Sequence, residues 1–323
     1  MKNIDVTALG ELLIDFTESG LSPQGNRLFE ANPGGAPCNV LAMLNKLGDK
    51  TAFIGKVGKD SLGNELKERV TKLGINTECL YEDQDVHTTL AFVSKLPNGD
   101  RDFSFYRNPG ADMNLKVEEV KESLIEDSKV FHFGTLSMTH KEVKAATLAA
   151  LAYAKKHNCL ISFDPNIREP LWDDLEDARK AVFIGLEYTD VLKISDNEIQ
   201  WLSGFEDYDE GIAWLREKYN IKLVVLSLGA EGSRAYYNDL RVEQAPFLNK
   251  DTIETTGAGD TFGACVLHYV LKYGIDELDE AKLYEMLRFA NAAASIVTTK
   301  KGALMVMPSA EVVHNYIENY GDR

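Results

Sequence analysis

The sequence of 323 residues lacks long apolar runs and is poor in basic residues. No uninterrupted apolar stretch approaches the ~18 residues that a membrane-spanning helix needs, so we expect no membrane association. Its 35 basic residues stand against 51 acidic ones, and the resulting net charge of -16 argues against a general surface for nucleic acid or anionic lipid. Local features must therefore hold any anionic ligand.

Cysteine is scarce and lacks the spacing of a metal site. The four cysteines, Cys38, Cys79, Cys159 and Cys265, are scattered, without a CxxC pair or nearby histidine ligands. Free thiols in a reducing compartment fit this pattern better than disulfides or zinc do. The first residues, MKNIDVTALGELLIDF, also lack the basic and unbroken apolar segments of a secretion signal, and we expect a cytoplasmic location.

Common nucleotide-binding motifs are missing too. The sequence contains no GxxxxGK[ST] loop and no set of glycine loop, HRD and DFG segments. The first strand-like run does not lead into the GxGxxG spacing of a Rossmann dehydrogenase, which is the general alternative for an α/β chain. Phosphate binding, if present, must use another loop.

The hydrophobic pattern predicts an α/β fold. Apolar, β-branched runs such as TAFIGKVG, KVFHFG, CLISFDPN and KLVVLSLG alternate with helix-like stretches. This alternation predicts three layers, with helices on both faces of a central, mostly parallel sheet, in a single domain over residues 1–323. The expected helices cover 37–47, 61–73, 141–156, 173–188, 260–273, 279–298 and 309–320.

One region breaks this alternation. Between residues 78 and 106, ECLYE, TTLAFVSKL and RDFSFY have the composition of strands, and PNGD at 97–100 is typical of a turn. We expect a small antiparallel sheet here, which parts of 11–33 could join. Its exposed face could cover a ligand as a lid or pair with a second copy, which predicts a homodimer.

The segment from Glu254 to Asp260, ETTGAGD, precedes an apolar helix. Small residues allow a close approach of the backbone, and the free N–H groups and dipole at a helix start favour phosphate. The segment is therefore a candidate anion site, although a glycine turn with Asp260 as a helix cap would give the same pattern.

Two separated segments resemble known signatures. TTGAGDTFGA resembles the C-terminal signature of the ribokinase-like (PfkB) carbohydrate kinases, and GGAPCNVLAMLNKLG, from Gly34 to Gly48, resembles their N-terminal signature. GELLIDF, DFSFYRNPGAD, FDPNIREPLW, LSLGAEGS and KKGALMVMP are most similar to the fructokinase branch. The resemblance implies a ribokinase-like fold with a β lid, and an ATP-dependent kinase acting on a small sugar with Mg²⁺.

The resemblance also assigns roles to individual residues. Asp260 would take the proton of the sugar hydroxyl, and the amides of Gly257, Ala258 and Gly259 would hold the charge on the transferring phosphate. The sugar would contact Asp15, Gly34, Gly35, Asn39, Arg107 and Arg168; ATP would contact Ser227, Gly229, Gly232 and Asn291. From the residues alone, these positions also have purely structural explanations. Asp15 could be a carboxylate at a strand end, Gly34 and Gly35 an ordinary loop, Arg107 and Arg168 surface arginines, and the segment from Gly229 to Gly232 a hairpin turn.

Two positions depart from the family pattern. Glu198 matches the glutamate of an NxxE motif that organises Mg²⁺ through water, but Ser195 stands where asparagine is usual. Glu254 stands where the family usually has an aspartate beside a monovalent cation site. The resemblance therefore gives less support to activation by potassium. The local alternative for Glu198 is favourable capping in the first turn of a helix.

Two alternatives to a fructokinase stay open. A kinase for 2-keto-3-deoxygluconate would use Arg107 and Arg168 to bind the carboxylate of its substrate, whereas Pro37 favours fructose because such kinases usually carry glutamate there. A noncatalytic sugar-binding regulator could use the same fold. Retention of Asp260 and the GAG segment argues against that regulator.

Overall fold

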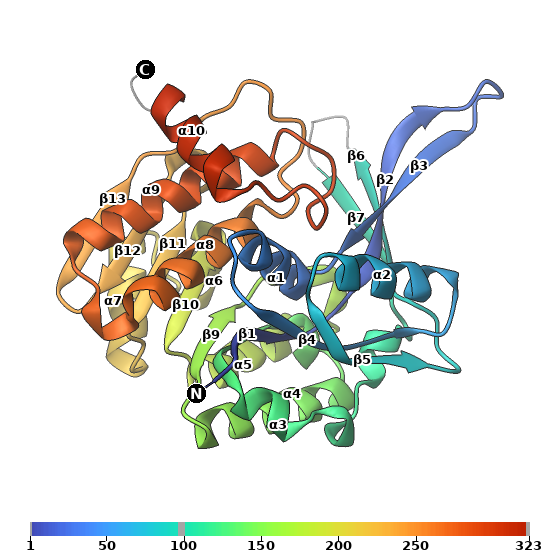
Figure 1. Ribbon diagram of the computed structural model, residues 1–323, viewed down its shortest axis with the longest axis horizontal. Coiled ribbons are helices and arrows are strands. Elements are labelled where there is room, and N and C mark those ends of the chain that lie inside the picture. The colour runs from blue at the N-terminus through green and yellow to red at the C-terminus, as the bar shows by residue number, and fades with distance from the viewer. Residues whose placement is uncertain (1, 96–100, 321–323) are drawn as a thin grey trace.

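A nine-stranded sheet forms the centre of the computed structural model, which describes residues 2–95 and 101–320 (Figure 1). Neighbouring strands pair in parallel from β11 to β5, and the β11–β12 and β12–β13 pairs at one edge are antiparallel. In sheet order the strands are β13 (Leu240–Gln244), β12 (Ser233–Tyr237), β11 (Leu223–Ser227), β10 (Val191–Ser195), β9 (Leu160–Asp164), β8 (Ser128–Gly134), β1 (Ile4–Leu9), β4 (Thr51–Gly58) and β5 (Asn76–Asp83).

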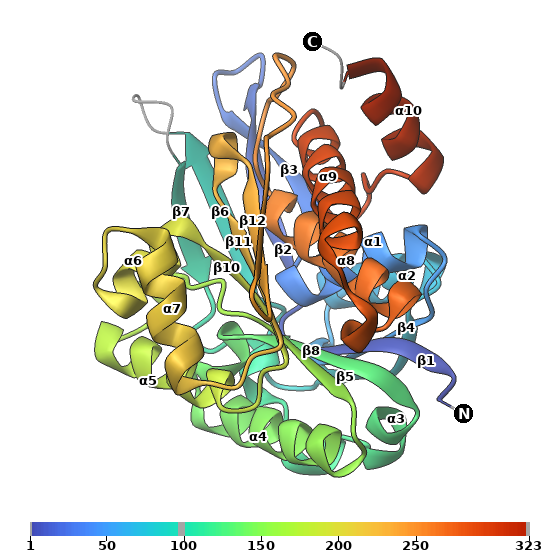
Figure 2. The ribbon, with the colours of Figure 1, turned by 90° about the vertical axis from the view of Figure 1, so that its left-hand side faces the viewer.

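Helices cover both faces of this sheet, as Figure 2 shows. Successive side chains of a strand point to opposite faces, so Val225 packs into one apolar core and Val224 into the other. One core involves α1 (Ala36–Lys46), α2 (Ser61–Lys72), α8 (Ala258–Tyr273), α9 (Glu280–Val297) and α10 (Ala310–Tyr320). The other involves α3 (Glu122–Glu126), α4 (Lys141–Lys156), α5 (Leu175–Leu186), α6 (Asp196–Ser203) and α7 (Tyr208–Lys218). The predicted three-layer α/β fold with a central, mostly parallel sheet is confirmed.

A second, smaller sheet projects from the main body (Figure 1). Its order is β3 (Arg27–Gly34), β2 (Leu13–Leu21), β6 (Leu90–Lys95) and β7 (Arg101–Tyr106). The β2–β3 and β6–β7 pairs are antiparallel, but β2 and β6 pair in parallel, so the sheet is mixed and not purely antiparallel.

The sequence prediction for this insertion needs one correction. The ECLYE run belongs to β5, which pairs in parallel with β4 at the edge of the main sheet and not with the small sheet. The other two strands of the small sheet are instead β2 and β3. This agrees with the prediction that parts of 11–33 could join it. The predicted turn at 97–100 lies outside the described residues.

The chain crosses between the two sheets near residues 10–12. Strand β1 ends at Leu9 in the main sheet, and β2 begins at Leu13 in the small one. The carboxyl ends of the central strands therefore face the underside of the small sheet and the start of α8, which is where open parallel sheets bind ligands. Among residues 2–95 and 101–320, every helix is too short or too polar to span a lipid bilayer.

Candidate active site

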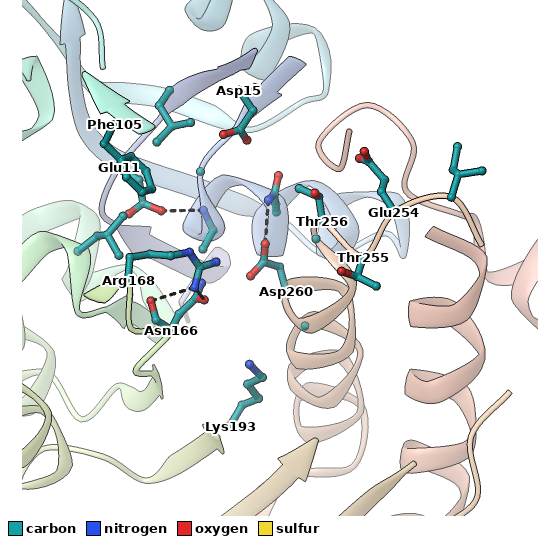
Figure 3. A pocket seen from close by; sticks show the side chains of 18 of the residues that line it. Glu11, Asp15, Phe105, Asn166, Arg168, Lys193, Glu254, Thr255, Thr256 and Asp260 are labelled. Atoms are coloured by element: carbon teal, nitrogen blue, oxygen red, sulfur yellow. Dashed lines mark hydrogen bonds between the residues drawn. The ribbon is translucent and has the colours of Figure 1, made fainter. Parts of the chain in front are cut away.

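A cavity of about 550 Å³ lies between the small sheet and the first turn of α8 (Figure 3). Its walls come from segments far apart in the sequence. They include the predicted residues Asp15, Gly35, Asn39, Arg168, Glu254, Gly257, Gly259 and Asp260. The cavity therefore brings together most of the residues proposed for the sugar and for the phosphoryl transfer.

Asp260 occupies the third position of α8, which begins at Ala258, and it does not cap the helix. The Asn39 side chain of α1 donates a hydrogen bond from Nδ2 to Asp260 Oδ2 at 2.7 Å. Burial raises the pKa of Asp260, although this hydrogen bond and the charges of Lys193 and Arg168 oppose the shift. A carboxylate held in one orientation with a raised pKa has the properties of a general base.

Gly257 caps α8 in a left-handed conformation, with φ of 76°. A Cβ atom at this position would lie 2.2 Å from the Ala303 Cβ, so only glycine fits this turn. The Ala258 N–H donates to the Thr255 carbonyl at 3.2 Å. That amide is thus already used within the turn, whereas Gly257 and Gly259 border the cavity directly.

Asp15 enters the cavity from strand β2 of the small sheet (Figure 3). Burial raises its pKa to about 7, against the opposing charge of Arg168 and together with the charges of Glu254 and Asp260. The neighbouring Gly34 does not itself line the cavity among the described residues, but a Cβ there would lie 2.4 Å from Asp15 Oδ2. Gly34 therefore leaves room for the carboxylate.

The two predicted arginines have different positions. Arg168 lines the cavity and donates from Nη1 to Asn166 Oδ1 at 2.7 Å. Arg107 is buried outside the described lining, where its side chain pairs with Asp112 at 2.7 Å and donates to the Leu136 carbonyl at 2.9 Å. Arg107 thus connects Asp112 to Leu136, which lines the cavity, and its direct contact with the substrate stays a prediction.

A second cavity, of about 710 Å³, lies on the other side of the α8 start. All four residues predicted for the nucleotide line it: Ser227, Gly229, Gly232 and Asn291. Much of the remaining wall is apolar and includes Pro246, Phe247, Leu248 and Phe262. Leu248 is 63% exposed, which leaves an apolar surface available to a flat ring.

The 255–259 segment separates the two cavities. Thr252, Thr255 and Gly259 line both of them. A ligand in each cavity would therefore meet at the N-terminus of α8, where Asp260 lies. This shared wall is the geometry that transfer of a group between two bound molecules requires.

Glu198 lies in neither lining among the described residues. Its Oε1 accepts a hydrogen bond from the Ile167 N–H at 2.9 Å, and its Oε2 accepts from the Ser195 N–H and hydroxyl. Ser195 in turn caps α6 in a capping box with Glu198. The serine that departs from the family motif thus has a local structural role.

Glu254 lines the sugar-side cavity and accepts from the Gly302 N–H at 2.6 Å. Within residues 2–95 and 101–320, His, Cys, Asp and Glu side chains form no group of three or more that could hold a metal ion. A metal at this site would need ligands from the nucleotide and water.

Four polar residues of the cavity were not predicted from the sequence: Glu11, Asn166, Lys193 and Thr252. Burial raises the pKa of Glu11 to about 7, and its Oε1 accepts from the Ala36 N–H at 2.8 Å. Lys193 is the charged residue of the otherwise apolar run VLKI, and that interruption was the available signal.

Comparisons with known proteins show the family to which the chain is similar. A model of the pfkB family of carbohydrate kinases matches residues 3–310. Fructokinase-2 of Solanum lycopersicum is 39% identical over 307 residues, which cover 94% of this chain and 93% of that protein.

Solved structures show the same similarity. The fructokinase of Xylella fastidiosa with bound ATP superposes with a TM-score of 0.90 at 28% identity, over 100% of both chains. The fructokinase of Vibrio cholerae O395 with fructose, ADP and calcium ion gives a TM-score of 0.88 at 27% identity, over 98% of this chain and 99% of that one.

Proposed function

The chain belongs to the pfkB family of carbohydrate kinases, and we propose that it is an ATP-dependent fructokinase that makes fructose 6-phosphate. The observation that carries the proposal is the meeting of the two cavities at Gly259, beside Asp260. The sugar occupies the smaller cavity under the small sheet, and ATP occupies the larger one.

In the proposed reaction, Asp260 accepts the proton of the sugar hydroxyl while the hydroxyl oxygen forms a bond to the γ-phosphorus of ATP. The bond from that phosphorus to the β–γ bridging oxygen breaks, and ADP leaves with the electron pair. The N–H groups of Gly257 and Gly259 stabilise the charge on the phosphoryl oxygens, assisted by the dipole of α8. Ala258 contributes only if its N–H turns away from the Thr255 carbonyl.

The charge of the sugar cavity favours a neutral polyol over a sugar acid. Four carboxyl groups line it, from Glu11, Asp15, Glu254 and Asp260, and among the described lining the cations are Arg168 and Lys193. Arg107, which a keto-deoxy acid would need, is neutralised by Asp112. A substrate carboxylate would therefore face repulsion that hydroxyl groups, as hydrogen-bond donors, would not.

Pro37 supports the choice of fructose only indirectly. It lies in the first turn of α1 and does not line the cavity among the described residues. A Cβ on Gly10 would lie 2.5 Å from Pro37 Cγ, so the ring packs against the crossing between the sheets. We propose that Asp15, Asn39 and Arg168 contact the sugar, with Gly35 at its floor.

A divalent metal accompanies ATP in this reaction, and we propose Mg²⁺. Glu198 would orient it through water by the second lone pair of Oε1, because Oε2 already accepts two hydrogen bonds from Ser195. Potassium near Glu254 is a weaker proposal, because that carboxylate already accepts the Gly302 N–H.

The small sheet is proposed to act as the lid and as a dimer interface. Asp15 and Phe105 lie in register on its cavity face. Phe16, Phe29, Phe92 and Tyr106 form a cluster of ring contacts on the opposite face, and Tyr106 is 64% exposed. A second copy covering these rings would remove an exposed apolar surface from water.

The four buried free thiols agree with a cytoplasmic location, which we also propose.

An assay of ADP release tests the substrate. With ATP and Mg²⁺, we expect turnover on fructose to exceed that on 2-keto-3-deoxygluconate, ribose and adenosine. Preference for the sugar acid would favour the rival kinase. Binding of sugar and ATP without any ADP release would favour the noncatalytic regulator.

A further inference from the structure

Lys193 is a buried cation for which the reaction as described has no use. It lies near the end of β10, its side chain is 12% exposed, and it lines the sugar-side cavity. A buried ammonium group costs several kcal/mol unless a partner compensates it. A residue kept in so costly a place calls for a specific interaction.

Asp164 is the partner of Lys193 in the described structure. Lys193 Nζ lies 3.2 Å from Asp164 Oδ1 and 3.1 Å from Oδ2, and the Asp164 side chain is 8% exposed. The register pairs Leu192 with Phe163, so the two charged residues that follow stand side by side on adjacent strands. Asp164 therefore fixes the direction of the lysine side chain.

The surroundings keep Lys193 charged. Burial by itself lowers its pKa, but the carboxylates of Asp164, Glu198 and Asp260 outweigh burial and raise it. The nearby His132 remains neutral, because burial and the lysine charge lower its pKa to about 4. An ammonium group has three N–H donors, so the ion pair with Asp164 leaves donor capacity for a ligand.

The ammonium group lies at the boundary between the two cavities. A Cβ atom on Gly259 would lie 3.2 Å from Lys193 Nζ, and Gly259 lines both cavities. Figure 3 shows the lysine rising from its strand toward the space between Asp260 and Arg168. A phosphoryl group at the start of α8 would thus have Lys193 beside it.

We propose that Lys193 contacts the γ-phosphoryl group of ATP and neutralises its charge during transfer, with Asp164 as the positioning residue. This inference rests on the proposed kinase function. The lysine stays protonated throughout: the hydroxyl proton goes to Asp260, and the leaving electron pair goes to ADP. Such a contact forms with ATP and is lost with ADP, which has no γ-phosphate.

Binding of ATP and of ADP, measured by calorimetry with Mg²⁺ and without sugar, tests the proposal in Lys193→Gln. Glutamine removes the charge but can still donate to Asp164. We expect ATP affinity to fall by at least about 10-fold, with ADP affinity within about threefold of the wild type. We also expect kcat on fructose to fall by about 100-fold or more, with little change in the KM for fructose.

Lys56→Gln is the matched control. Lys56 is also buried, with a side chain 6% exposed and paired with Glu119, but it is not among the described residues of either cavity. Its variant should keep the wild-type ratio of ATP to ADP affinity. Lys193→Arg, which keeps the positive charge, should recover part of the preference for ATP.

Two results would overturn the proposal. One is an equal loss of ATP and ADP affinity in Lys193→Gln, which a merely structural role would produce. The other is an unchanged affinity for ATP in a folded Lys193→Gln protein. Because the binding test uses no sugar, wild-type inactivity on fructose would reject the proposed substrate without deciding the role of Lys193.

Discussion

At the scale of single residues, the proposed site depends on which charged side chains the fold buries and which partners it gives them. Asp260 and Asp15 could be predicted because both lie in segments with a recognisable pattern. The pairing of Arg107 with Asp112 could not, because an arginine in a strand-like run gives no sign of whether it faces a ligand or a neighbouring loop. Glu11 and Lys193 were missed since burial of a charge depends on the folded surroundings.

The raised pKa of Glu11 leads to a prediction about stability. In the unfolded chain its carboxyl ionises near the ordinary value of 4.5, but in the folded protein it does so at about 7. Below pH 4.5 both states hold the proton. As the pH rises from 4.5 to about 7, the unfolded chain releases this proton while the folded protein retains it, so stability falls; above about 7 both states are ionised and the loss is complete.

Glu11→Gln should remove this loss. At pH 8 and without ligand, we expect the free energy of unfolding of the variant to exceed that of the wild type by up to about 3 kcal/mol. At pH 4 the two proteins should agree, which serves as the internal control. Urea unfolding at both pH values gives the measurement, and an advantage for the variant only at pH 4 would contradict this account.

At the scale of elements, the alternation of strands and helices was enough to predict the main sheet and its covering helices. It could not assign β5, because a short strand has the same composition in either sheet. Nor could it divide the first apolar run into β1 and β2, since Gly10 is the one break signal at residues 10–12 and a single glycine also occurs within strands. Which sheet a strand joins is decided by its pairing partner, far away in the sequence.

The start of α8 provides a prediction at this scale. Gly257→Ala would place a Cβ in a left-handed turn, against Ala303. We expect a loss of about 1–3 kcal/mol of stability and, because the helix start must shift, a fall in kcat of about 100-fold. Chemical unfolding and the ADP-release assay measure the two effects.

Gly204→Ala is a matched control for this variant. Gly204 has φ of 79°, close to the 76° of Gly257, but it ends α6 in open space, where an added Cβ would meet no atom within 4 Å. It should lose about 1 kcal/mol of stability and keep full activity. Equal activity of the two variants would show that the shape of the α8 start is not critical.

At the scale of the whole molecule, the two adjoining cavities could not be predicted from local patterns. Asp15, Asn39, Arg168 and Asp260 meet only because the carboxyl ends of the strands, the small sheet and α8 converge. Resemblance to a family could name these residues in advance, but it could not show that Thr252, Thr255 and Gly259 line both cavities.

The small sheet gives a prediction about assembly. Tyr106 on β7 belongs to the ring cluster and is 64% exposed, so Tyr106→Asp would place a charge on the proposed dimer face. We expect light scattering to give a dimer mass for the wild type and a monomer mass for Tyr106→Asp. Leu175→Asp, at an exposed position at the start of α5, should remain dimeric. A monomeric wild type would exclude this interface.

The most direct test of the central claim is the Asp260→Asn variant. Asparagine keeps the size of the side chain and an oxygen to accept the Asn39 hydrogen bond, but it cannot take a proton. We predict that calorimetry finds fructose and ATP affinities within about threefold of the wild type, whereas ADP release falls by at least about 100-fold. Near-normal turnover in this variant would contradict the assignment of Asp260 as the base that activates the sugar.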